Sequence, residues 1–125
     1  FMKKAIQLSI KSVNSGTGPF GAVVVKNNKI ISEGFNTVTA AKDPTSHAEV
    51  VAIRNACKLL NNFSLQGCDL YTTCEPCPMC FSDAMIYEEL NKNIKNRKIP
   101  MHQMMREEAL KAFDLWDKKV DKVKY

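Results

Sequence analysis

The fold and chemistry are decided by two stretches, Glu75-Pro76-Cys77-Pro78-Met79-Cys80 and, before it, His47-Ala48-Glu49. Thiolate and imidazole are the ligands that zinc prefers. Cysteines three residues apart at the start of a helix lie on one face, and the helix dipole is expected to lower their thiol pKa. Three protein ligands leave the fourth tetrahedral position for water. The pattern therefore predicts a catalytic Zn²⁺ site formed by His47, Cys77 and Cys80.

Glu49 follows the predicted histidine ligand by two residues. A carboxylate beside a metal-bound water can accept its proton and pass it to a leaving nitrogen. The combination H-x-E with P-C-x-x-C is the pattern of zinc-dependent deaminases. Ser46-x-x-Glu49 is also a capping box, in which Glu49 would bond back to the Ser46 N–H. The joint pattern with the cysteines favours catalysis by Glu49.

The other cysteines admit alternative explanations. An iron–sulfur site built on Cys74-x-x-Cys77-x-x-Cys80 would need a fourth cysteine soon afterwards, and none follows. Cys74 is expected to be a small buried residue at the end of a strand, and Cys57 and Cys68 to be core thiols. A structural zinc closed by Cys74 remains open as an alternative.

Periodicity predicts helices and strands in alternation. The expected helices are 1–14, 47–60, one starting at Pro76, 81–91 and 107–124; the expected strands are 20–26, 29–36, 68–73 and 99–105, with a turn at Asn27-Asn28 and loops at 37–46 and 92–98. This order fits a sheet covered by helices.

Composition limits the class of protein. A chain of 125 residues suffices for one domain. The net charge of +5 is spread along the chain, and Arg54, Arg97 and Arg106 are its only arginines, which argues against a nucleic-acid partner. An odd cysteine count, without a secretory-signal pattern or a long apolar run, predicts a cytoplasmic protein without a membrane segment.

The stretches Gly18–Val23, Asp43–Glu49 and Thr73–Cys80 together resemble the cytidine deaminase superfamily, and most resemble the bacterial-type guanine deaminases. The resemblance implies a three-layer α/β/α sandwich with a mixed sheet, formed by one domain over residues 1–125. It also implies zinc-dependent hydrolysis of guanine to xanthine and ammonia, with Glu49 as the proton shuttle.

Further roles are implied only by this resemblance. Asn36 matches the residue that hydrogen-bonds the base, and Phe20 an aromatic wall of the purine pocket. Asp83 matches a carboxylate facing the purine, and Tyr125 a tyrosine that closes the pocket. The part from about residue 83 to residue 125 would be exchanged between the subunits of a homodimer. The alternatives are a turn residue for Asn36, a helix cap for Asp83 and a disordered end for Tyr125.

The chain departs from the family pattern directly after Cys80. Relatives place about 25 more residues between Cys80 and Phe81, and these complete a helix and form a core strand whose loss would break sheet pairing. Either the natural chain has a further segment here, which we favour, or the chain is truly shortened. Two other functions compete with guanine deamination: adenosine deamination in transfer RNA, which needs a basic groove, and a non-enzymatic zinc-stabilised binding module.

Overall fold

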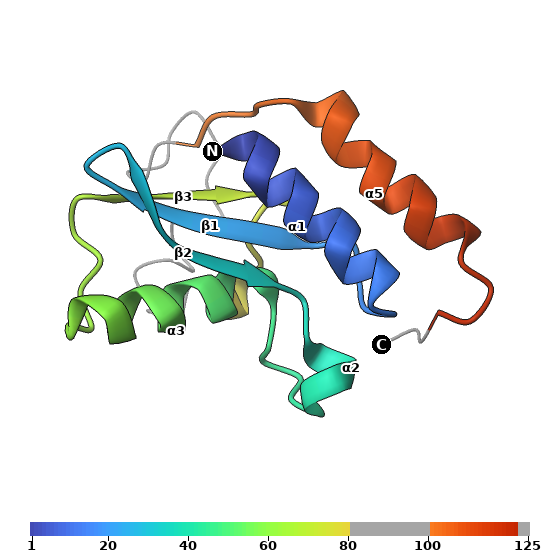
Figure 1. The fold of residues 1–125 in the computed structure, drawn as a ribbon, viewed down its shortest axis with the longest axis horizontal. Helices are drawn as coiled ribbons and strands as arrows, with labels where there is room; N and C mark the ends of the chain where they lie inside the picture. The colour runs from blue at the N-terminus through green and yellow to red at the C-terminus, as the bar shows by residue number, and fades with distance from the viewer. Residues whose placement is uncertain (81–100, 123–125) are drawn as a thin grey trace.

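The computed structural model describes residues 1–80 and 101–122, which form an α/β fold (Figure 1). The elements are α1 Met2–Asn14, β1 Gly21–Lys26, β2 Lys29–Phe35, α2 Val38–Ala41, α3 Ala48–Leu60, β3 Cys68–Thr72, the 3₁₀ helix η1 Pro78–Cys80 and α5 Arg106–Lys118. Within these residues no helix has the length and apolar character needed to cross a membrane.

The sheet has the strand order β2-β1-β3, and β1 pairs antiparallel with both neighbours. Asn27 and Asn28 connect β1 to β2 with φ angles of 50° and 58°, the left-handed conformation that a two-residue hairpin turn requires. The predicted turn is thus confirmed. The pairings seen among the described strands are all antiparallel, and the parallel pairing of the expected mixed sheet is not among them.

Alternate residues of β1 face opposite helical layers. Val23 and Val25 pack with Leu8 of α1, whereas Ala22 and Val24 pack against the alanines of α3. On the α1 side, α5 lies beside α1 (Figure 1), and Ala109 joins the α1 core cluster. The sheet therefore lies between two helical layers, and the predicted three-layer α/β/α sandwich is confirmed.

A glycine on β2 brings α3 close to the sheet. A Cβ atom on Gly34 would lie 2.6 Å from the backbone nitrogen of Ala52 and closer still to the backbone oxygen of Ala48. Backbone atoms cannot move aside as a flexible side chain can. The residues in the first turn of α3 are therefore held at a fixed height above the sheet.

Four of the secondary-structure predictions are wrong. The first concerns the cysteine segment and the second concerns the loop 37–46. No helix starts at Pro76, and only η1 forms, because the proline at 78 disfavours helical backbone at Cys77. A short helix, α2, interrupts the expected loop 37–46. The N–H of Val38, the first residue of α2, donates a hydrogen bond to the Oδ1 atom of Asn36 at 3.2 Å. The helix ends at Lys42, which has the left-handed conformation.

The other two differences concern the C-terminal part. Residues 101–105 form no strand, and Met105, with φ of 50°, is incompatible with one. α5 ends at Lys118 instead of continuing to Lys124. The Nζ atom of Lys122 bonds the carbonyl oxygen of Asp117 at 2.6 Å, which satisfies an acceptor at the helix end.

Candidate active site

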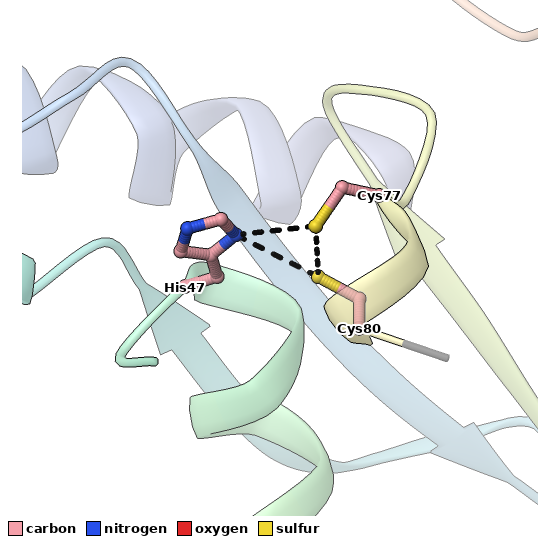
Figure 2. A group of neighbouring side chains, drawn as sticks. All are labelled: His47, Cys77 and Cys80. Atoms are coloured by element: carbon pink, nitrogen blue, oxygen red, sulfur yellow. Dashed lines mark hydrogen bonds between the residues drawn. The ribbon is translucent and has the colours of Figure 1, made fainter. Parts of the chain in front are cut away.

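His47, Cys77 and Cys80 meet at one end of α3 (Figure 2). The Nδ1 atom of His47 lies 3.6 Å from the Cys77 sulfur and 3.7 Å from the Cys80 sulfur. The two sulfur atoms are 3.5 Å apart. The three side chains predicted as ligands are thus brought together from the N-cap of α3 and from the segment 77–80, which ends in η1.

These separations fit one tetrahedral zinc ion. Zinc–sulfur bonds of about 2.3 Å and zinc–nitrogen bonds of about 2.0–2.1 Å place two tetrahedral sulfurs about 3.8 Å apart and a nitrogen about 3.6 Å from each sulfur. The observed distances are within a few tenths of an ångström of these values. The donor set of one imidazole and two thiols is also one that zinc prefers.

Local backbone conformation presents the ligands. His47 is the N-cap residue of α3, with φ −67° and ψ 154°. Its side chain makes no capping bond, and its imidazole faces the cysteines (Figure 2). The turn from Cys77 to Cys80 is closed by the Cys80 N–H, which donates to the Cys77 carbonyl at 2.9 Å. Both ends of the group are therefore fixed by the backbone.

Glu49 lies beside this group and is only 4% exposed. Its Oε1 atom accepts a hydrogen bond from the Thr72 hydroxyl at 2.8 Å, and its Oε2 atom lies 3.7 Å from the Cys80 sulfur. The capping box considered for Ser46 and Glu49 is not formed, because the Ser46 N–H donates to the Asp43 carbonyl instead. The carboxylate of Glu49 is thus turned towards the metal-binding group.

The pKa of the Cys80 thiol differs from expectation. Burial, followed by the negative charge of Glu49 and the nearness of Cys77, raises the pKa of the Cys80 thiol well above its usual range, so the expected lowering by a helix dipole is wrong for this residue. Partial loss of hydration and the negative charge of Glu49 also raise the pKa of the Cys74 thiol. The positive charge of a bound metal deprotonates a coordinating thiol, so the site is suited to a thiolate only when a cation is present.

Cys74 does not belong to the group of possible metal ligands. That group, as far as residues 1–80 and 101–122 are concerned, consists of His47, Cys77 and Cys80. Cys74 is exposed, so the expectation of a small buried residue is wrong. Cys57 and Cys68 are half-buried, and Cys68 packs against the α3 side of the core. The described part of the chain therefore gives no support for a zinc closed by four cysteine and histidine ligands.

The two substrate-binding candidates in the described chain lie where the strand pair ends. Asn36 is 1% exposed, its N–H donates to the Phe20 carbonyl at 3.1 Å, and its Oδ1 accepts from Val38. The side-chain oxygen of Asn36 thus takes part in the turn that was considered as its alternative role. The NH₂ group of the same side chain is a hydrogen-bond donor and is not used in that turn. The ring of Phe20 meets that of Phe113 edge to face, with centroids 5.6 Å apart.

The remaining candidates, Asp83 and Tyr125, lie outside the described residues. Two residues that hold parts of the site in place were not singled out by sequence patterns. Thr72 holds Glu49, and Asp43 holds the loop that precedes His47. A β-strand threonine and a loop aspartate carry no motif of their own, although Asp43 belongs to the stretch that carries the family resemblance.

A sandwich of this kind, with a His–Cys–Cys group beside a buried glutamate, defines the zinc-dependent deaminase class of hydrolases. Residues 1–94 match the family model described as the cytidine and deoxycytidylate deaminase zinc-binding region, and the chain belongs to this family. The predicted family and zinc-binding type of enzyme are thereby confirmed.

Individual relatives add detail. The guanine deaminase of Bacillus subtilis (strain 168) is 42% identical over 151 residues, covering 100% of this chain and 97% of the relative. The X-ray structure of a guanine deaminase from Bacillus subtilis superposes with a TM-score of 0.64 at 42% identity, covering 100% of this chain and 96% of that one. The tRNA-specific adenosine deaminase of Aquifex aeolicus (strain VF5) is 45% identical over 94 residues, 75% of this chain and 62% of that protein. The 151-residue alignment exceeds the length of this 125-residue chain, as expected if the relative has additional residues within the matched region.

Proposed function

We propose that the chain catalyses zinc-dependent hydrolytic deamination of guanine to xanthine and ammonia. The observation that carries the chemistry is the position of Glu49, buried and directed at the His47–Cys77–Cys80 group. The similarity over the whole chain to a guanine deaminase supports guanine as the substrate. The similarity to the transfer-RNA enzyme covers 75% of the chain.

His47, Cys77 and Cys80 would hold the zinc ion. When bound, zinc lowers the pKa of water to about 7 and so supplies hydroxide at neutral pH. Glu49 accepts the water proton and delivers it to a ring nitrogen, which makes the carbon bearing the amine more electrophilic. After the water oxygen has added to that carbon, Glu49 takes the remaining proton from this oxygen and passes it to the amine nitrogen. The carbon–nitrogen bond then breaks as the oxygen becomes the carbonyl of xanthine, and ammonia leaves.

Base recognition in this proposal uses Asn36 and Phe20. Because the Oδ1 atom of Asn36 is engaged by Val38, the base would accept a hydrogen bond from the amide NH₂. Phe20 contacts the face of the purine, and Asp83 and Tyr125 keep the roles that the family resemblance implies. A pocket that hydrogen-bonds its substrate rejects bases that would leave those groups unpaired.

The proposed assembly is a single deaminase domain over residues 1–125 that forms a cytoplasmic homodimer, with the part from about residue 83 onwards exchanged between subunits. The apolar side chains exposed on α5, Leu110 and Leu115, support a partner on this helix. Sedimentation would test the dimer.

Ammonia release tests the substrate. Guanine, guanosine, adenine, cytidine and a transfer-RNA anticodon stem-loop are supplied in turn to the zinc-loaded protein. Release from guanine alone supports the proposal. Release from the stem-loop with a steep loss at higher salt would replace guanine by transfer RNA, and a zinc-loaded chain inactive on every substrate would favour a binding module.

A further inference from the structure

The chain between Asn36 and His47 returns on itself and is closed by backbone hydrogen bonds. The Thr37 N–H donates to the Ser46 carbonyl at 3.0 Å, and the Asp43 N–H donates to the Val38 carbonyl at 3.1 Å. The loop therefore begins beside the proposed base-binding amide and ends at a proposed metal ligand. The position of His47 depends on how the last residues of this loop, from 43 to 46, are held.

One carboxylate holds those residues. The Oδ1 atom of Asp43 accepts from the Thr45 N–H at 2.8 Å and from the Thr45 hydroxyl at 2.7 Å, and its Oδ2 atom accepts from the Ser46 hydroxyl at 2.7 Å. Arg54, in the second turn of α3, adds a longer ion pair at 3.6 Å. These hydrogen bonds lower the pKa of Asp43 to about 2, so the carboxylate is charged at any working pH.

The backbone of His47 joins this loop to α3, because its carbonyl accepts from the Val51 N–H at 2.9 Å. The His47 N–H donates to the Thr45 carbonyl at 2.8 Å, and its side chain caps nothing. Both residues that lead into His47, Thr45 and Ser46, are bonded to Asp43 through their side chains. A change at Asp43 is therefore transmitted to the imidazole through two consecutive peptide units.

We propose that Asp43 is a positioning residue for the metal site, which fixes His47 at the distance from Cys77 and Cys80 that zinc requires. Asp43 touches neither the metal ligands nor the base and acts only through Thr45 and Ser46. The inference takes zinc from the proposed function but does not depend on the identity of the substrate. Outer residues that orient metal ligands are typically worth about 10–100-fold in metal affinity.

The test compares Asp43→Asn and Asp43→Ala with a control, Arg54→Gln. This control removes the longer ion pair and a 3.3 Å hydrogen bond from Arg54 to the Thr45 hydroxyl, but leaves in place the three hydrogen bonds that Asp43 accepts from Thr45 and Ser46. Zinc release to an excess of a chromophoric chelator is followed at a temperature at which circular dichroism shows every variant folded. We expect release about 10-fold faster or more in Asp43→Ala, an intermediate rate in Asp43→Asn, which keeps one acceptor oxygen, and a rate close to the parent in Arg54→Gln.

A second measurement separates positioning from a general loss of stability. With Co²⁺ in place of zinc, the visible absorption bands report the geometry of the ligands, and we expect them to shift in Asp43→Ala and not in Arg54→Gln. A lower melting temperature with unchanged zinc release and unchanged cobalt bands would overturn the proposal. Equal effects in Arg54→Gln would overturn it too. A protein that fails on guanine but shows the expected zinc release refutes the substrate and leaves the role of Asp43 standing.

Discussion

The hydroxyl of Thr72 donates a hydrogen bond of 2.8 Å to the Oε1 atom of Glu49. Thr72 is the last residue of β3, and Glu49 lies in the first turn of α3, so this bond joins the sheet to the helix at the metal-binding group. With one oxygen held, the other oxygen of Glu49 lies 3.7 Å from the Cys80 sulfur. Oε1 thus makes a structural contact, and Oε2 is the oxygen that we propose takes part in the reaction.

Thr72→Val removes this donor while keeping the shape of the side chain. We expect kcat to fall about 10-fold or more. The loss of a hydrogen bond to a buried carboxylate costs about 1–3 kcal/mol of free energy, and the freed carboxylate can rotate away from the proton that it transfers. Zinc content should be unchanged. Steady-state kinetics and metal analysis check both values. Thr72→Ser, which keeps the hydroxyl, is the control, and a fully active Thr72→Val would refute this role.

Glu49→Ala is expected to fold, bind zinc and lose nearly all turnover, because the Glu49 carboxylate is the proposed carrier of the proton and lies beside the metal-binding group. Glu33 offers a matched control, since it is an exposed carboxylate whose partner is Lys4 at 3.1 Å. Glu33→Ala should retain activity. Ammonia release and bound zinc are measured for both. Retained turnover in Glu49→Ala would remove Glu49 from the mechanism.

Replacement of single cysteines separates a catalytic zinc from a closed structural one. Cys74 lies outside the His47–Cys77–Cys80 group. We therefore expect Cys74→Ser to keep one zinc per chain and Cys77→Ser to lose it. Metal analysis after dialysis gives the answer directly. Loss of zinc from Cys74→Ser would instead indicate four ligands and a site without room for water.

The sequence was sufficient for those features that depend on local pattern. The hairpin at Asn27 and Asn28 and helix α3 follow from turn chemistry and periodicity, which act over a few residues. The ligand preference of zinc singled out three side chains that the structure brings together, while their role as ligands stays a prediction. The end of α5 and the absence of a helix at Pro76 depend on competing local effects, the Lys122 contact with Asp117 and the proline at 78, that simple periodicity does not weigh.

The contacts that refine the site could not be predicted in the same way. Thr72 and Glu49 are 23 residues apart in sequence and meet only because β3 pairs with β1 while α3 packs across the same sheet. Asp43 takes its hydrogen bonds from residues nearby, yet its side chain could equally have faced solvent. Only the folded loop shows that it accepts hydrogen bonds from Thr45 and Ser46, the two residues before His47.

Acid titration should reveal the contribution of Asp43 to stability. Its pKa in the folded chain is about 2, against an ordinary value of 3.8, so the folded state favours the charged form. That contribution is present above the unfolded value and is lost as the pH falls through the folded value. In the zinc-free protein, the difference in melting temperature between the parent and Asp43→Asn should stay constant from about pH 7 to 5 and shrink from about pH 4 to 2.

The zinc-free form is needed for this titration because protonation of the ligands would itself release the metal. Arg54 is the charged group that faces Asp43, and Arg54→Gln should show most of the acid dependence of the parent. A difference that stayed constant down to pH 2, or grew as the pH fell, would contradict the hydrogen-bonded carboxylate described above.

Gly34→Ala tests whether the close packing of α3 on β2 sets the site. The added Cβ would lie 2.6 Å from the Ala52 nitrogen and nearer to the Ala48 oxygen, so α3 must move away from the sheet. Overpacking of this kind costs about 1–3 kcal/mol or more, and the movement carries His47 and Glu49 with it. We expect a lower melting temperature together with weakened zinc retention.

Gly67→Ala is the control, because its φ of +75° is strained for alanine while nothing lies within 4 Å of the new atom. It should lose stability but keep its zinc, and equal zinc loss in both variants would show that stability alone, and not the height of α3, governs the metal site.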